Sequence, residues 1–342
     1  MLVAIYHNNR DIRIKDVSKP EIGPDEILLK VMASGICGTD VVEWYRLPKA
    51  PRVLGHEATG IIDEVGANIT TYKVGDRVFV SHHVPCNNCS YCMKDSHTAC
   101  ETLHTTNYYP GGFSQFIRVP KINVETGVYR LPFDMSYEEG TFIEPLACAV
   151  RGQRLVNIKK GDTVLIIGSG MAGILHIQLT KLKGAMKIFV ADINPDRLLL
   201  AKKFGADSVI DAKNDLSKRL KELNDGKGVD KVLVCTSAPK AALTALDCVD
   251  RGGTILFFAV PDPKIMIPIP ITQFWRNETT IKTSYGAAPR DLSEALEILS
   301  QKKINVLEMI THRIDILDAA EGFRLVAEAG KSLKVIIEPN RT

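Results

Sequence analysis

From Asp162 onward the sequence alternates between short, uniformly apolar runs and helix-length segments, and few folds accommodate this alternation. Strands that are apolar along their whole length are buried on both faces. A strand, a helix and a second strand in succession form a parallel pair with a right-handed crossover. The sequence therefore predicts a doubly wound α/β domain around a parallel sheet. Its strands are expected at residues 163–167, 187–192, 207–211, 230–235, 253–259 and 280–284.

The first of these strands leads directly into the loop GSGMAG, which opens the next helix. Gly168 and Gly170 allow the backbone to turn tightly and approach a pyrophosphate, and Gly173 lets the helix pack close to the sheet. The second strand ends in Asp192, whose carboxylate can bind adenosine ribose hydroxyls and repel a 2′-phosphate. Arg197 either reaches round to such a phosphate or lies on the surface of the following helix. We expect a bound dinucleotide, NAD in preference to NADP.

A chain of 342 residues exceeds the usual size of one hydrophobic core, so a second domain is expected. Short strands bounded by Gly, Pro and Asp dominate the first 135 residues, which indicates a β-rich domain. Ser136 and Glu139 form a capping-box pattern at the start of a helix, and Pro145 is expected to place Glu144 at a break in regular helix geometry. The strands of this domain are expected at residues 27–33, 60–65, 77–81 and 113–119.

The last fifty residues resemble neither a linker nor a further parallel unit. Helices are expected from Asp291 and, capped by Asp318 with Glu321, shortly before a strand at residues 334–337. We expect this tail to fold back on the first domain. Residues 1–147 and 289–342 would then form one domain and residues 148–288 the other.

Half of the cysteines stand in fifteen residues, in the stretch CNNCSYCMKDSHTAC. Disulfides rarely persist in a reducing compartment, so a metal explains the cluster better than bridges do. Four thiolates from one loop close a tetrahedral zinc shell without an open position, which is typical of a structural site. The alternative is a chance cluster of thiols. The predicted ligands are Cys86, Cys89, Cys92 and Cys100.

Composition and charge exclude several classes of partner. Hydrophobic residues make up 45% of the chain and charged residues 24%, as in ordinary globular proteins. The net charge of +3 is spread thinly, without a Lys/Arg run long enough to follow a nucleic-acid backbone. No stretch approaches the roughly 20 apolar residues of a membrane helix, and the first residues, MLVAIYHNNRDIRIKD, lack the uninterrupted apolar run after a basic start that is typical of a signal peptide. We expect a cytoplasmic protein that binds neither nucleic acid nor a membrane.

A second group of potential metal ligands lies outside the cysteine cluster. Cys37 stands in GICGTD, and His56 and Glu57 stand in GHE, both at the ends of apolar strands. One thiolate, one imidazole and one carboxylate can form a three-ligand zinc site with an open coordination position. Spacing alone does not establish that these residues meet, and a cysteine after a strand is often a small core residue.

These motifs, in this order, carry a family resemblance. GICGTD, GHE, GDRV at residues 75–78, the four-cysteine loop, EPLA at 144–147 and the glycine loop together resemble the zinc-dependent medium-chain alcohol dehydrogenase superfamily. The resemblance covers essentially the whole chain. The chain looks like the branch of polyol (sorbitol) and threonine dehydrogenases, because EP stands where liver-type enzymes place a zinc-binding cysteine. ITHR at 310–313 points to the same branch.

The resemblance implies a GroES-like, β-rich catalytic domain beside a Rossmann domain. It implies that Cys37 and His56 bind a catalytic zinc, that Glu57 and Glu144 complete its shell or exchange in it, and that the four clustered cysteines bind a structural zinc. Relatives pair their Rossmann sheets edge to edge. A homodimer or homotetramer is therefore expected, with the strand at 280–284 at the contact.

The expected reaction is hydride transfer between NAD and a secondary alcohol or ketone. Thr39 resembles the family's hydroxyl that takes the alcohol proton. The histidine that often continues this relay is replaced here by Val42, so the proton leaves through ribose hydroxyls, water or another histidine such as His82, His83 or His104.

The sequence leaves the substrate open and allows two other functions. Tyr285-Gly286 lacks an arginine that sorbitol dehydrogenases tend to carry, which disfavours a simple sugar alcohol and leaves amino alcohols, cyclic hydroxy-compounds and other polyols open. Two other functions use the same fold: a zinc-free double-bond reductase, which has no need of the cysteines, and a non-catalytic dinucleotide-binding protein.

Overall fold

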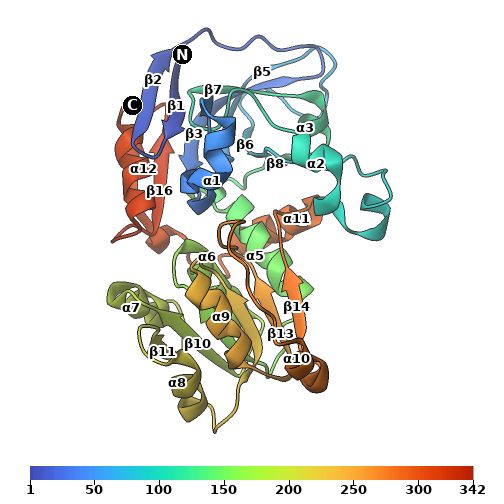
Figure 1. Ribbon diagram of the computed structural model, residues 1–342. Helices are drawn as coiled ribbons and strands as arrows, with labels where there is room; N and C mark the ends of the chain where they lie inside the picture. The colour runs from blue at the N-terminus through green and yellow to red at the C-terminus, as the bar shows by residue number, and fades with distance from the viewer. Residues whose placement is uncertain (342) are drawn as a thin grey trace. The chain divides into compact units, whose positions relative to one another are not determined.

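The computed structural model describes residues 1–341, which form two compact units (Figure 1). Unit 1 consists of Met1–Ala147 and Ala287–Thr342, and unit 2 consists of Cys148–Gly286. Within residues 1–341, no helix combines the length and the apolar character needed to cross a membrane.

Unit 2 is built on a six-stranded sheet in the order β11-β10-β9-β12-β13-β14, and every pair in it is parallel. The predicted doubly wound fold is confirmed. Its strands are β9 (Thr163–Ile167), β10 (Lys187–Asp192), β11 (Ser208–Asp211), β12 (Val229–Val234), β13 (Val249–Phe257) and β14 (Thr280–Thr283). Its helices are α6 (Met171–Leu182), α7 (Pro195–Lys203), α8 (Leu216–Leu223), α9 (Pro239–Cys248) and α10 (Ile271–Asn277).

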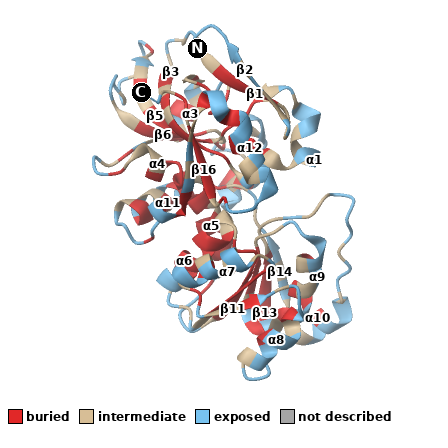
Figure 2. Cartoon of the chain, turned by 90° about the vertical axis from the view of Figure 1, so that its left-hand side faces the viewer, coloured by how far each residue is buried: buried red, intermediate tan, exposed pale blue. Residues whose placement is uncertain are grey.

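The core of unit 2 follows from the apolar character of its central strands. Leu165, Phe189, Val232 and Ile255 are completely buried, and they come from four adjacent strands. Figure 2 shows buried residues concentrated in the strands, with exposed residues on the outward faces of the helices. The carboxyl end of β9, where the glycine loop begins, is therefore held by a rigid, dry sheet.

Unit 1 contains a seven-stranded sheet with strands from both of the chain segments that form the unit. The order is β15-β16-β3-β5-β6-β8, with β7 paired to β3, and a separate three-stranded sheet has the order β2-β1-β4. The strand β16 lies between β15 and β3, so the tail folds back on the first domain as expected. The strands are β1 (Leu2–Asn8), β2 (Asp11–Asp16), β3 (Ile27–Gly35), β4 (Arg52–Val53), β5 (Glu57–Val65), β6 (Arg77–Ser81), β7 (Phe116–Val119), β8 (Val128–Arg130), β15 (Ile310–Asp315) and β16 (Lys334–Glu338).

Helices of unit 1 are mostly short and connect these strands. They are α1 (Glu43–Arg46), α2 (Glu101–Thr105), α3 (Lys121–Thr126), α4 (Tyr137–Gly140), α11 (Pro289–Ser300) and α12 (Ala319–Glu328), while α5 (Ile143–Leu155) passes from unit 1 into unit 2. The longer α12 packs against β16 and β2, as Figure 1 also shows. Its buried Phe323 contacts the ring of Tyr6 at 5.6 Å between centroids, which ties the tail to the first strand.

Three local expectations were wrong. Glu144 does not lie at a helix break, because α5 begins at Ile143 and contains Pro145 in its first turn, where the missing N–H of a proline costs no hydrogen bond. Asp318 makes no side-chain cap, and Glu321 pairs with Arg324 at 2.5 Å instead. The strand expected at 113–119 begins only at Phe116. The Ser136–Glu139 capping box is present as predicted.

Candidate metal and dinucleotide sites

Adjacent strands bring Cys37, His56 and Glu57 together. Gly35 in β3 pairs with Glu57 in β5, so the residues that follow β3 and precede β5 meet at one end of the sheet. One ligand atom from each of the three residues lies within 4.8 Å of the others. This closeness, which sequence spacing does not establish, is a property of the folded sheet.

Asp40 contacts two of the three residues of this cluster, Cys37 and His56. Its carboxylate is completely buried, accepts a hydrogen bond from the Cys37 amide at 3.1 Å and one from Arg46 at 2.9 Å, and lies 3.4 Å from Nδ1 of His56. Burial raises the pKa of Asp40, but His56 and then Arg46 outweigh it, so the pKa is below its ordinary value. The carboxylate therefore stays charged and orients the imidazole, as carboxylates behind metal-binding histidines do.

The surroundings of His56 favour a positive charge. Burial lowers its pKa, but Asp40 and Cys37 raise it by more, and the net result is well above the ordinary value. A potential that attracts a proton to this ring also attracts a divalent cation, which displaces the proton when it binds. Asp40 is the last residue of GICGTD and was not among the predicted site residues, although an acid three residues after a metal-binding cysteine could have indicated it.

Glu57 is held by a cation from the other end of the chain. Its Oε2 accepts a hydrogen bond from Nζ of Lys334 in β16, and both side chains are 0% exposed. Its Oε1 is buried without a hydrogen-bond partner among residues 1–341. An orphaned buried carboxylate oxygen beside a thiolate and an imidazole fits a metal ion. A Cβ on Gly35 would lie 2.1 Å from Oε2, so this position requires glycine.

Thr39 and Glu144 lie near this cluster without belonging to it. The Thr39 hydroxyl donates to Sγ of Cys37 at 3.3 Å. Glu144, in the first turn of α5, is not among the converging ligand atoms of the described residues. Burial, and then Asp40, Glu144 and Glu57, raise the pKa of Tyr108 well above its ordinary value, so Glu144 acts on the same region as the other two carboxylates.

Two histidines stand beside His56. The ring of His82 lies 4.9 Å from that of His56 and 3.8 Å from that of His83, between centroids. Burial lowers the pKa of both, that of His83 to about 3, so both rings are neutral at pH 7. His104 contributes to the shift of His83. Val42 lies at the end of the first turn after Cys37 and offers no polar side chain.

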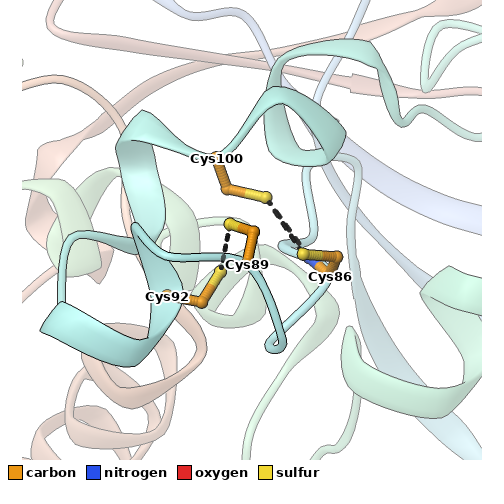
Figure 3. A group of neighbouring side chains, drawn as sticks. All are labelled: Cys86, Cys89, Cys92 and Cys100. Carbon is orange, nitrogen blue, oxygen red and sulfur yellow. Dashed lines mark hydrogen bonds between the residues drawn. The ribbon is translucent and has the colours of Figure 1, made fainter.

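The four clustered cysteines converge in a loop of their own (Figure 3). The sulfur atoms of Cys89 and Cys92 are 3.5 Å apart and those of Cys86 and Cys100 are 3.6 Å apart. A tetrahedron with zinc–sulfur bonds of about 2.3 Å has edges of about 3.8 Å, so the donor set fits zinc. Burial raises the pKa of Cys92 to about 12, whereas at Cys100 the amides of Cys86 and Leu103 outweigh burial and bring the pKa down to about 6, so the thiolate is favoured at Cys100.

In unit 2 the glycine loop has the geometry that a pyrophosphate needs. Gly168 has φ +94°, and a Cβ on Gly173 would lie 2.0 Å from the Gly168 carbonyl oxygen. Asp192 accepts hydrogen bonds from the Ser169 amide at 2.7 Å and hydroxyl at 2.9 Å. These bonds fix the acid beside the loop. Arg197 lies close by, with Nη1 3.5 Å from the position of a Cβ on Gly170.

Comparison with known proteins identifies the family of the chain. Residues 23–130 match the model of the alcohol dehydrogenase GroES-like domain, and residues 172–301 match that of the zinc-binding dehydrogenase family. The chain is 33% identical to a probable D-xylulose reductase A of Aspergillus fumigatus, over 98% of this chain and 96% of the relative. It belongs to the zinc-dependent medium-chain alcohol dehydrogenases.

Further relatives of this dehydrogenase place it in the polyol branch. It is 34% identical to the D-arabitol-phosphate dehydrogenase of Enterococcus avium, over 95% of this chain and 93% of the relative. Its fold matches a zinc-binding dehydrogenase of Sinorhizobium meliloti bound to NADP, with a TM-score of 0.88 and 26% identity over 99% of both chains. The predicted GroES-like and Rossmann folds are confirmed, and the dehydrogenase acts on CH–OH groups with zinc and a nicotinamide cofactor.

Proposed function

We propose that this dehydrogenase transfers hydride between a secondary hydroxyl of a polyol-like substrate and NAD, at a zinc held by Cys37 and His56 with Glu57 or Glu144. The observation that carries the proposal is the convergence of Cys37, His56 and Glu57, whose Oε1 is buried without a hydrogen-bond partner among the described residues. A bound zinc would make the alcohol more acidic, so that an alkoxide forms near neutral pH. Cys86, Cys89, Cys92 and Cys100 hold a second zinc that stabilises their loop.

The residues around the metal position then handle the proton. Thr39 presents its hydroxyl 3.3 Å from the Cys37 sulfur and takes the proton that the alcohol releases. Asp40 keeps the imidazole of His56 in one orientation. The Val42 side chain cannot pass a proton on. The proton therefore leaves through ordered water, cofactor hydroxyls or a histidine elsewhere in the chain. His82 and His83 are the imidazoles grouped with His56.

The cofactor preference is NAD. Asp192 is fixed beside the glycine loop by two bonds to Ser169, and its charge disfavours a 2′-phosphate. Arg197 lies near Gly170, where its guanidinium is available to the pyrophosphate or to a 2′-phosphate. The preference is tested by measuring KM for NAD and for NADP in the wild-type protein and again in the Asp192→Ala variant.

The remaining expectations concern assembly and location. β14 is one of the two edge strands of the parallel sheet, and three of its four residues are exposed. Pairing of two such edges would give a homodimer, and pairing of dimers a homotetramer. We place the protein in the reducing cytoplasm because eight cysteines are free thiols, and the four in the cluster must remain reduced to bind metal.

Zinc-loaded protein should reduce NAD in the presence of secondary alcohols, open-chain or cyclic polyols, polyol phosphates or threonine. Cys37→Ser should abolish turnover and lower the zinc content, while NAD binding to unit 2 is retained. Cys148→Ser is the matched control, because Cys148 belongs to neither ligand group. Full turnover by Cys37→Ser, or a zinc content unchanged by it, would refute the site assignment.

A further inference from the structure

A short segment beside the metal cluster is rich in positive charge. Arg46, Lys49 and Arg52, here called the cationic segment, lie within the stretch RLPKAPR. Nη2 of Arg46 donates to Asp40 at 2.9 Å and to the Thr39 hydroxyl at 3.3 Å. The segment therefore begins in direct contact with the hydroxyl that takes the substrate proton.

The other two cations are close to the first but have no anionic partner. Nζ of Lys49 lies 4.4 Å from the centroid of the Tyr45 ring, and the guanidinium carbon of Arg46 lies 4.8 Å from it. Arg52 is half-buried in β4, opposite Tyr6 of β1. Within residues 1–341, neither Lys49 nor Arg52 makes an ion pair with a carboxylate, and the Arg52 guanidinium makes no hydrogen bond.

Nearby carboxylates offset this charge only in part. Asp40 is already engaged by Arg46 and faces His56. Glu43 accepts a hydrogen bond from the Asn9 amide at 3.2 Å. Burial and then the charge of Arg46 lower the pKa of Arg52, as expected for a half-buried guanidinium among like charges. A fold that leaves such a group without a partner loses stability, and a ligand with a negative charge restores it.

The histidines at the metal cluster lie within the field of the same cations. Burial and the neighbouring histidines are the larger causes of the lowered pKa of His82 and His83. Arg46 and Arg52 lower the pKa of His82 further, and Arg46 and Lys49 lower that of His83. Nδ1 of His82 is buried without a hydrogen-bond partner among the described residues. The region next to Thr39 thus offers positive charge from the cationic segment together with that unpartnered ring nitrogen of His82.

We propose that the cationic segment binds an anionic group of the substrate, a phosphate ester or a carboxylate, with Arg52 and Lys49 as its ligands. This inference rests on the proposed function, since the hydroxyl of the same substrate must reach Thr39 and the metal. The planar fork of Arg52 matches two oxygens of either anion, and Lys49 adds a point charge. The anion fixes the orientation of the substrate and thereby selects which hydroxyl is oxidised.

Two matched pairs of substrates separate the sources of the anion. D-arabitol 1-phosphate against D-arabitol differs by a phosphate, and L-threonine against 1-amino-2-propanol differs by a carboxylate. We expect kcat/KM for the charged member of one pair to exceed that of its neutral partner by about 10-fold or more. Arg52→Gln should lower that ratio about 10- to 100-fold, and Lys49→Gln should lower it less. Arg10→Gln, an exposed arginine in the same unit, is the control.

Binding of inorganic phosphate and of acetate, measured by calorimetry, tests the segment without turnover. The wild-type protein should bind one of them, and Arg52→Gln should bind it about 10-fold more weakly with its zinc content unchanged. Equal kcat/KM within both pairs, or anion binding unaffected by Arg52→Gln, would overturn the proposal while leaving the dehydrogenase assignment intact. A rise in the KM for NAD alone would also overturn it, because the segment would then serve the cofactor. If no alcohol is oxidised, the proposed function fails, and the calorimetry still decides whether the cationic segment binds an anion.

Discussion

Lys334→Met tests whether the buried pair between Lys334 and Glu57 is ionised. Both side chains are 0% exposed, and Nζ of Lys334 otherwise lies over the ring of Phe142 at 5.4 Å from the centroid. Removing one partner of a buried pair leaves an uncompensated charge and typically costs about 3–5 kcal/mol. At about 2–4 °C per kcal/mol for a unit of this size, Tm should fall by about 6–20 °C. Methionine keeps the volume, so the loss reports the charge.

The assay is thermal and urea unfolding with and without zinc. A bound zinc offers Glu57 another positive partner, so the loss in the variant should be smaller in zinc-loaded protein than after chelation. Adding Glu57→Gln to Lys334→Met removes both charges and should recover about 2 kcal/mol or more of the lost stability. Lys303→Met, at an exposed position, is the control. A Lys334→Met protein within about 1 kcal/mol of wild type in the absence of zinc would refute an ionised pair.

Three further outcomes are expected. Cys92→Ser should lower the zinc content by one per chain in elemental analysis and reduce Tm, and an unchanged zinc content would contradict a metal in this loop. Gly173→Ala should weaken NADH binding at least about 10-fold in a fluorescence titration, because its Cβ would lie 2.0 Å from the Gly168 carbonyl oxygen; unaltered binding would contradict the role of the loop. Burial lowers the pKa of His176 to about 3. The unfolded state therefore takes up more protons as pH falls from about 6.5 toward 3, and stability decreases by up to about 1.4 kcal/mol per pH unit. His176→Gln should therefore reduce the dependence on pH of the free energy of unfolding, measured with urea between pH 6.5 and 4.5. His82 and His83 contribute to this dependence in the same direction, so part of it remains in the variant. An unaltered slope would contradict a neutral, buried His176.

Features encoded in a short stretch were predictable from the sequence. The parallel sheet of unit 2 was anticipated because its strands are apolar throughout, and GSGMAG indicated the phosphate loop because each glycine has a steric reason. The four-cysteine spacing likewise placed Cys86 to Cys100 together, as the structure does. In each case the residues that must meet are neighbours along the chain or along one sheet edge.

Features that depend on distant segments were not predictable. Nothing in the local sequence around Lys334 indicates that it pairs with Glu57, because the contact arises from the insertion of β16 beside β3. At shorter range, the contacts of Arg46 with Asp40 and Thr39 depend on the path of the chain through α1, which the residue pattern does not specify. Pro145 misled the reading of Glu144, since the pattern does not distinguish a proline in the first turn of a helix from one that ends it.

The position of β16 also sets the order in which the protein is completed during its synthesis. Glu57 and Lys334 are 277 residues apart. At about 5–20 residues per second, a ribosome needs about 15–55 s to make the chain between them. Throughout that interval the parallel-sheet unit acquires all its strands, while β3 is paired only with β5 and β7 and Glu57 lacks its counter-charge. A nascent chain therefore completes its nucleotide-binding fold before the carboxylate of its metal cluster receives the Lys334 counter-charge.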